Sequence, residues 1–143
     1  VGALLGEAVV SPNLSIQRDF RYMVKRMGGM LAKGRALGIQ FEVLFEDGLY
    51  LQLGCQAVDL AQRIQNAFRT CGVEMFLHSP TNQQFPILSR SQREALARKY
   101  AFNHWQDLDQ DRAVVRFCTS WATRPEAVEE LCRDIQAVCG GRQ

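Results

Sequence analysis

The sequence has few of the residues on which metal sites and membrane spans depend. Its two histidines, His78 and His104, lie 26 residues apart, and its five cysteines include no C-x-x-C pair. Zinc sites of the common kinds need closely spaced ligands, so we expect no metal site. No apolar run approaches the ~18–20 residues that a bilayer span requires, and the first ten residues have no basic segment typical of a secretory signal. We therefore expect neither a membrane-bound nor a secreted protein.

Charge of one sign is also lacking. The net charge is +2 over 143 residues, with 47% apolar and 22% charged residues. These are ordinary globular values, which exclude a disordered chain and give no basic footprint for nucleic acid. The unpaired cysteines, of which Cys132 and Cys139 share one face of an expected helix, are typical of small core residues in a reducing compartment. We therefore expect a cytoplasmic protein without nucleic-acid or membrane partners.

The first half of the chain predicts one strand followed by helices. Residues 1–10 are apolar and small, with no initiating Met, and indicate a buried strand of a chain that continues upstream. Amphipathic spacing predicts a short helix over 16–27, and the apolar stretch 30–45 indicates a mostly buried helix. The clearest helix covers 49–71, where apolar residues recur at three- and four-residue steps until Gly72 ends it.

The second half predicts a β-β-α-β-β-α order. Runs at 73–77, 82–88, 102–105 and 113–119 indicate strands, and a helix covers 91–100 with Ser91 and Glu94 as a capping box. Thr123 and Glu126 form a second capping box, with Pro125 in the first turn of the last helix. This order is typical of a small α+β domain with a mainly antiparallel sheet.

Two groups of residues are candidates for chemistry. Arg116 interrupts the apolar run 113–118, and a guanidinium held there would suit bidentate capture of a carboxylate. An edge strand with a solvent-facing Arg explains the same pattern equally well. Lys25, Lys33 and Arg35 flank a Gly-Gly pair and could neutralise a phosphate, although a junction between helices with solvated basic residues explains their composition better.

Five blocks of sequence, in order, resemble the low-specificity L-threonine aldolases of the β-eliminating lyase group. They are the opening stretch 1–10, Lys25-Arg26-Met27-Gly28-Gly29, Leu31-Ala32-Lys33-Gly34-Arg35, Ser79-Pro80-Thr81-Asn82-Gln83 and the segment 116–123 that begins Arg116-Phe117-Cys118. Members of this group are fold-type I enzymes that depend on pyridoxal 5'-phosphate. The resemblance covers essentially the whole chain.

The resemblance implies an α/β parent enzyme of which this chain is a C-terminal fragment, beginning just after the lysine that forms the Schiff base. That lysine would lie before Val1, so no catalytic residue is expected in this chain. Residues 1–45 would be a remnant of the cofactor-binding large domain, 46–72 a long linking helix, and 73–143 the small C-terminal α+β domain. By itself the fragment would be inactive.

The resemblance also assigns site residues. Arg116 matches the arginine that holds the substrate carboxylate, and Lys25 matches a second active-site lysine. Many relatives carry an arginine that reaches the cofactor phosphate of a neighbouring subunit, but here Ala32 stands at that position, with Lys33 and Arg35 as possible replacements. The implied partner is a second copy, in a homodimer or homotetramer. Two alternatives stay open: a pyridoxal-phosphate lyase acting on another amino acid, and a non-catalytic α+β interaction domain.

Overall fold

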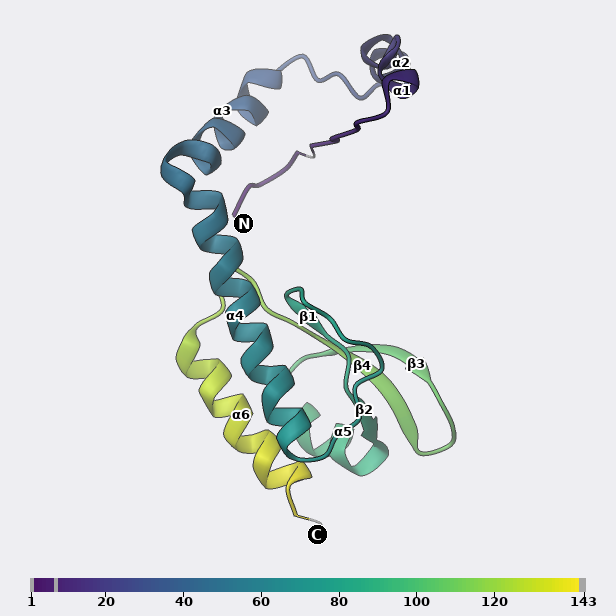
Figure 1. The fold of residues 1–143 in the computed structure, drawn as a ribbon, viewed down its shortest axis with the longest axis vertical. Coiled ribbons are helices and arrows are strands. Elements are labelled where there is room, and N and C mark those ends of the chain that lie inside the picture. Colours follow the sequence, from purple (N-terminus) through teal and green to yellow (C-terminus); the bar gives the residue numbers. More distant parts are fainter. Residues whose placement is uncertain (1, 7, 142–143) are drawn as a thin grey trace. The chain divides into compact units, whose positions relative to one another are not determined.

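The computed structural model describes residues 2–6 and 8–141, which divide into two compact units, residues 2–50 and 51–141. Each unit is described by itself (Figure 1). The first unit holds α1 (Leu14–Gln17), α2 (Phe20–Arg26), α3 (Gly34–Phe45), the 3-10 turn η1 (Glu46–Gly48) and the first residues of α4 (Leu49–Thr70). The second holds the rest of α4, four short strands and two further helices.

The first unit corrects two expectations. The described residues of the opening stretch form no strand and are exposed, because no neighbouring segment pairs with their backbone. They are held instead to α3, where Gln40 accepts a hydrogen bond from the Leu4 N–H at 2.7 Å and donates to the Leu5 carbonyl. The helix expected over 30–45 begins only at Gly34, and Leu44 is its one buried residue, because the described residues of this unit form no second layer over it.

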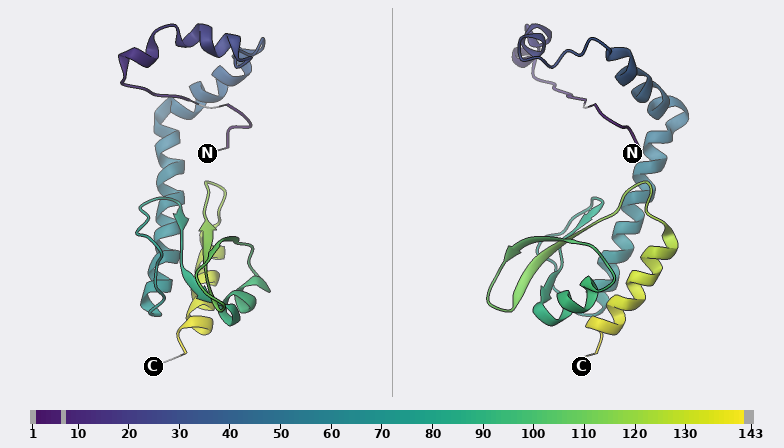
Figure 2. Two further views of the ribbon diagram at one scale, coloured as in Figure 1. Left: turned by 90° about the vertical axis from the view of Figure 1, so that its right-hand side faces the viewer. Right: turned by 180° about the vertical axis from the view of Figure 1, so that it is seen from behind.

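Helix α4 confirms the prediction for 49–71 almost residue for residue. Gly72 ends it at φ +73°, in the left-handed region that glycine adopts without a Cβ penalty. The buried side chains of α4 recur at three- and four-residue steps along one face: Ala57, Leu60, Ala61, Ile64, Gln65, Ala67 and Phe68. That face packs against helix α6 (Pro125–Cys139) and one side of the sheet, as Figure 2 shows.

The sheet is antiparallel and centres on β4 (Arg112–Cys118). On one side β4 pairs with β1 (Gln83–Gln84) and then with β2 (Ile87–Ser89); on the other side it pairs with β3 (Asn103–Asp107). The strand expected over 82–88 is thus two short strands, because Pro86 has no N–H to donate to a ladder. Only an isolated bridge, between Met75 and Pro86, remains of the strand expected at 73–77.

The core lies between the helices and one face of the sheet. Alternate residues of β4 point to opposite faces, so Val115 and Phe117 pack into the core while Arg116 faces the other way. The phenyl rings of Phe68 on α4 and Phe117 lie 5.4 Å apart between centroids. The structure therefore confirms the predicted α+β architecture, with its long helix and small antiparallel sheet.

Neither of the two predicted capping boxes forms. The N-cap of helix α5 (Arg90–Ala97) lies two residues earlier than predicted: Ser89 and Gln92 form its capping box instead of Ser91 and Glu94. Ser89 and Gln92 also fit the Ser-x-x-Gln pattern of a capping box. Ser89 becomes the N-cap because the pairing of β2 ends there. Helix α6 has no side-chain cap: Thr123 accepts a hydrogen bond from the Ser120 N–H instead, while Pro125 takes the first turn as predicted.

Candidate functional site

Arg116 lies on the central strand of the sheet, which excludes an edge strand as the explanation for its place in an apolar run. Its Cα pairs with that of Asn103 on β3, and Cys118, two residues further along β4, pairs with Gln83 on β1. In an antiparallel ladder, residues opposite one another share a face. These four side chains therefore lie on the face of the sheet that turns away from the core helices.

The guanidinium of Arg116 has two neutral hydrogen-bond acceptors. One terminal N–H donates to the side-chain carbonyl of Gln83 at 3.5 Å, and another donates to that of Asn103 at 3.3 Å. Its central carbon lies 5.4 Å from the centroid of the Trp105 ring, within cation–π range. The group is thus held from both neighbouring strands and by an aromatic ring.

The positive charge of Arg116 has no anionic partner among the described residues. No described carboxylate lies within ion-pair distance of it, and its buried Nε–H has no hydrogen-bond acceptor in this part of the chain. A buried donor without an acceptor costs ~1–3 kcal/mol. An anion with two oxygens, such as a carboxylate, is the ligand that a guanidinium with free N–H donors suits best.

A buried amide network holds the loop that leads into β1. Gln65 and Gln84, both almost inaccessible to solvent, are joined by a hydrogen bond of 2.6 Å. The side chains of both donate to the Ser79 carbonyl, and Gln84 also donates to the carbonyl of Thr81. The network ties α4 to the segment just before Gln83 and so fixes one acceptor of Arg116.

The other predicted site residues lie in the first unit. Lys25 is on α2, Lys33 precedes α3 and Arg35 is in its first turn; all three are exposed, and none is in an ion pair with a described residue. Between them Gly28 has φ +77°, a conformation that favours glycine. The structure thus leaves these cations free for an anion, in a unit separate from that of Arg116.

Sequence reasoning missed Gln83, Asn103 and Trp105. Uncharged amides and a tryptophan carry no signal of their own in a single sequence. Only the register of β3 against β4 brings two of them to Arg116, although Gln83 ended one of the family-like blocks.

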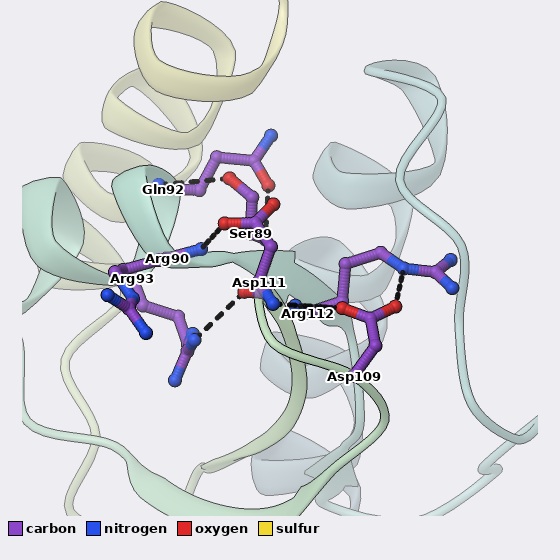
Figure 3. Close-up of polar contacts among 7 residues, drawn as sticks. All are labelled: Ser89, Arg90, Gln92, Arg93, Asp109, Asp111 and Arg112. Carbon is purple, nitrogen blue, oxygen red and sulfur yellow. Dashed lines mark hydrogen bonds and ion pairs between the residues drawn. The ribbon is translucent and has the colours of Figure 1, made fainter.

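A second polar cluster lies at the N-terminus of α5 (Figure 3), where the buried Nε–H of Arg93 has no hydrogen-bond acceptor among the described residues. Asp109 in the β3–β4 turn binds Arg112 at 2.8 Å, and its pKa is lowered to about 2 by the backbone N–H and the guanidinium of Arg112. Arg90 and Arg93 donate to backbone carbonyls of the same turn. They line an open cavity of about 680 Å³ together with acidic side chains, so its charge is mixed.

Histidines and cysteines do not assemble into a site in the described residues. His104 pairs with Val115 across the strands and so belongs to the opposite face from Arg116. Cys132 and Cys139 pack against the core, and burial raises the pKa of the Cys139 thiol to about 11. Within residues 2–6 and 8–141, no cluster of three potential metal ligands occurs, and no helix is long and apolar enough to cross a membrane.

Comparison with known proteins gives a consistent set of relatives. The chain is 32% identical over 138 residues to a low specificity L-threonine aldolase of a Pseudomonas species, and 30% identical over 140 residues to that of Pseudomonas aeruginosa. These alignments cover 96% and 97% of the chain but only 39% and 40% of the relatives. The chain therefore spans about two fifths of the length of the curated relatives it matches. No protein-family model matches it.

A solved structure agrees with these relatives. The chain superimposes on Leishmania major threonine aldolase with a TM-score of 0.79 and 31% sequence identity, over 83% of this chain and 35% of that one. The resemblance drawn from the five sequence blocks is thereby confirmed.

Proposed function

From the homology of this chain to the low-specificity L-threonine aldolases, which covers nearly its whole length, we propose that it is the C-terminal part of a pyridoxal-phosphate-dependent aldolase. The enzyme would cleave L-threonine and related β-hydroxy-α-amino acids to glycine and an aldehyde. The observation that carries the proposal is Arg116, held in place on the central strand with its charge uncompensated by any described carboxylate.

The hydrogen-bond donors and positive charges of these residues suit the carboxylate of the substrate and the phosphate of the cofactor. Each terminal nitrogen of Arg116 keeps a second N–H beyond the one that Gln83 or Asn103 accepts, and these supply donors for a substrate carboxylate. Lys25, Lys33 and Arg35 are exposed cations beside a glycine-rich turn, and we propose that they contribute to binding the cofactor phosphate. The lysine that bonds the cofactor would belong to a part of the enzyme outside this chain.

In this proposal Arg116 contributes to the reaction by orienting the substrate. Pyridoxal phosphate, when bound, supplies the electron sink that makes a bond at the α-carbon breakable. The guanidinium binds the α-carboxylate of the amino acid and so fixes the rotation about its N–Cα bond. In threonine this rotation would select the Cα–Cβ bond for cleavage. Because the arginine reads only the carboxylate, the β-substituent must be read by residues elsewhere in the enzyme.

Exposed apolar side chains in the first unit support an assembly with more protein. Large apolar residues that are half exposed or more lie along and near α3, a pattern typical of a surface that packs on another domain or subunit. They include Leu31, Val43 and Phe45. We propose that the rest of the enzyme and a second copy, in a homo-oligomer, cover them, and that the enzyme works in the cytoplasm.

The proposal is tested with the complete enzyme that contains this chain. Supplied with pyridoxal phosphate and L-threonine, it is expected to release glycine and acetaldehyde in equal amounts. A panel of β-substituted amino acids separates the aldolase from a lyase that eliminates a β-substituent, because elimination yields a keto acid and ammonia. Release of these products with no aldehyde from any β-hydroxy amino acid would contradict the proposal.

The 143-residue chain by itself provides the matched control. It is expected to show no threonine cleavage and only low, scattered pyridoxyl labelling of its three lysines after borohydride reduction. Stoichiometric labelling of Lys25 together with release of acetaldehyde would show that the catalytic lysine lies within this chain.

A further inference from the structure

We propose that Gln83, Asn103 and Trp105 are positioning residues of a carboxylate site, which hold the Arg116 guanidinium rigid while leaving its charge available. The inference rests on the proposed function and extends it from one residue to the shell around that residue. None of the three is charged, and all three lie within contact of the same guanidinium.

The neutrality of the acceptors is the central point. Arginine on a sheet is often held by an aspartate or glutamate, and such an ion pair would compete with any external carboxylate. Here both acceptors are amide carbonyls, which fix the direction of the N–H groups without cancelling the charge. A positioned cation of this kind binds an anion without first breaking an internal ion pair.

Trp105 forms the third support. Its ring lies 5.2 Å from that of Phe85 in an edge-on arrangement, with an interplanar angle of 73°. Phe85 is buried, whereas Trp105 is about half exposed, so the phenyl ring anchors a tryptophan that reaches the surface. The indole face stabilises the guanidinium and restricts the directions from which a ligand approaches it.

Gln83 is itself held in place by hydrogen bonds of its own segment. Its backbone N–H donates to the Thr81 hydroxyl, and the next residue, Gln84, belongs to the buried amide network. Asn103 is fixed by its pairing with Arg116 in the register of β3 and β4. Each acceptor is therefore placed by backbone that does not depend on the ligand.

The first measurement tests whether these amides restrain the guanidinium. In the 15N-labelled chain, the side-chain Nε–H of Arg116 is assigned by its loss in Arg116→Gln, and its heteronuclear NOE is measured. We expect a value close to that of the rigid backbone in the wild type, and a fall toward that of mobile arginines in Gln83→Met and Asn103→Leu. Gln106→Met, on the same face of β3, is the matched control and should leave the value unchanged.

The second measurement tests the charge that is left free. Cys118 is exposed, two residues from Arg116 on the same face, so about 7 Å separates them along the strand. Its thiolate displaces iodide from iodoacetate or iodoacetamide by the same S–C bond formation, so the ratio of the two rates isolates the attraction for a carboxylate. We expect Arg116→Gln to lower that ratio about threefold, the effect of one unit charge at this distance in water.

The isosteric variants Asn103→Asp and Gln83→Glu place a carboxylate against the guanidinium without a change of shape, which protects the test from unfolding. We expect each to lower the ratio at Cys118 as far as Arg116→Gln does, while exposed Cys55 on α4 serves as the internal reference.

The outcomes separate the two proposals. An unchanged ratio in Arg116→Gln would overturn the carboxylate site and with it the proposed role of Arg116. A lowered ratio in Arg116→Gln, with an unchanged NOE in Gln83→Met and Asn103→Leu, would leave that role intact and overturn the positioning by Gln83 and Asn103. Lowered values in both measurements support a carboxylate site in which Gln83 and Asn103 position Arg116.

Discussion

Replacement of Gln84 by leucine tests how the loop before Gln83 is held. The side chain of Gln84 is fully buried; it accepts a hydrogen bond from Gln65 at 2.6 Å and donates to the carbonyls of Ser79 at 3.2 Å and Thr81 at 3.0 Å. The Ser79 carbonyl keeps the bonds from Gln62 and Gln65 in the variant. The Thr81 carbonyl and one N–H of Gln65 lose these partners.

The size of the effect follows from those two groups. The Gln65 N–H is left buried without a partner, which costs ~1–3 kcal/mol. Thr81 is exposed, so water can bind its carbonyl, and the variant loses there only the ~0.5–1.5 kcal/mol of an ordinary hydrogen bond. The apolar surface of the new leucine offsets about 1–2 kcal/mol. We therefore expect Gln84→Leu to lower the free energy of unfolding by about 1–2 kcal/mol, a shift of the urea midpoint on the order of 1 M.

The assay is urea unfolding of the 143-residue chain, followed by circular dichroism, with Gln106→Leu on exposed β3 as the matched control. In the double variant with Gln65→Leu, the loss should be smaller than the sum of the single losses, because both remove the same bond. If Gln84→Leu matches the control, or if the two losses simply add, the network does not hold the loop and the reasoning is refuted.

Three further predictions concern the rest of the second unit. The pKa of Asp109 is lowered from 3.8 to about 2 by Arg112, so the ionised carboxylate stabilises the fold above pH 3.8 and this stabilisation is lost as the pH falls toward 2. Asp109→Asn should therefore lack this part of the loss of stability in acid. Urea unfolding at several pH values measures the difference. Gly72→Ala should lower the free energy of unfolding by about 1–2 kcal/mol, because φ is +73° there, and equality with wild type in thermal melts would contradict this. Cys139, with a pKa raised to about 11 by burial, should react with iodoacetamide at pH 8 at least tenfold more slowly than exposed Cys118, as peptide mass spectrometry will show.

Local patterns predicted the second unit well. The spacing of Leu60, Ile64 and Phe68 sets one apolar face, and Gly72 adopts the left-handed conformation that commonly ends a helix, so the sequence predicts the bounds of α4. The strand 113–119 was equally clear, because β-branched and aromatic residues are concentrated in it. Both features depend on neighbours close in sequence.

Features that depend on distant partners were predicted poorly. The stretch 1–10 has the composition of a buried strand, but a strand forms only where another backbone pairs with it, and none does so among the described residues. At Arg116 the sequence left two explanations equal, and the pairing of β4 on both sides excludes the edge strand. Gln83, Asn103 and Trp105 were missed for the same reason, since strand register brings them together.

The central claim is that Arg116 binds the carboxylate of an amino-acid substrate. It is tested most directly by Arg116→Lys in the complete enzyme, because an ammonium keeps the charge but cannot reproduce the geometry of the guanidinium donors. A charge-assisted hydrogen bond of this type contributes ~1.5–3 kcal/mol, so kcat/KM for L-threonine should fall roughly ten- to a hundredfold, mainly through KM. Unchanged kcat/KM and KM in a correctly folded variant would contradict the claim.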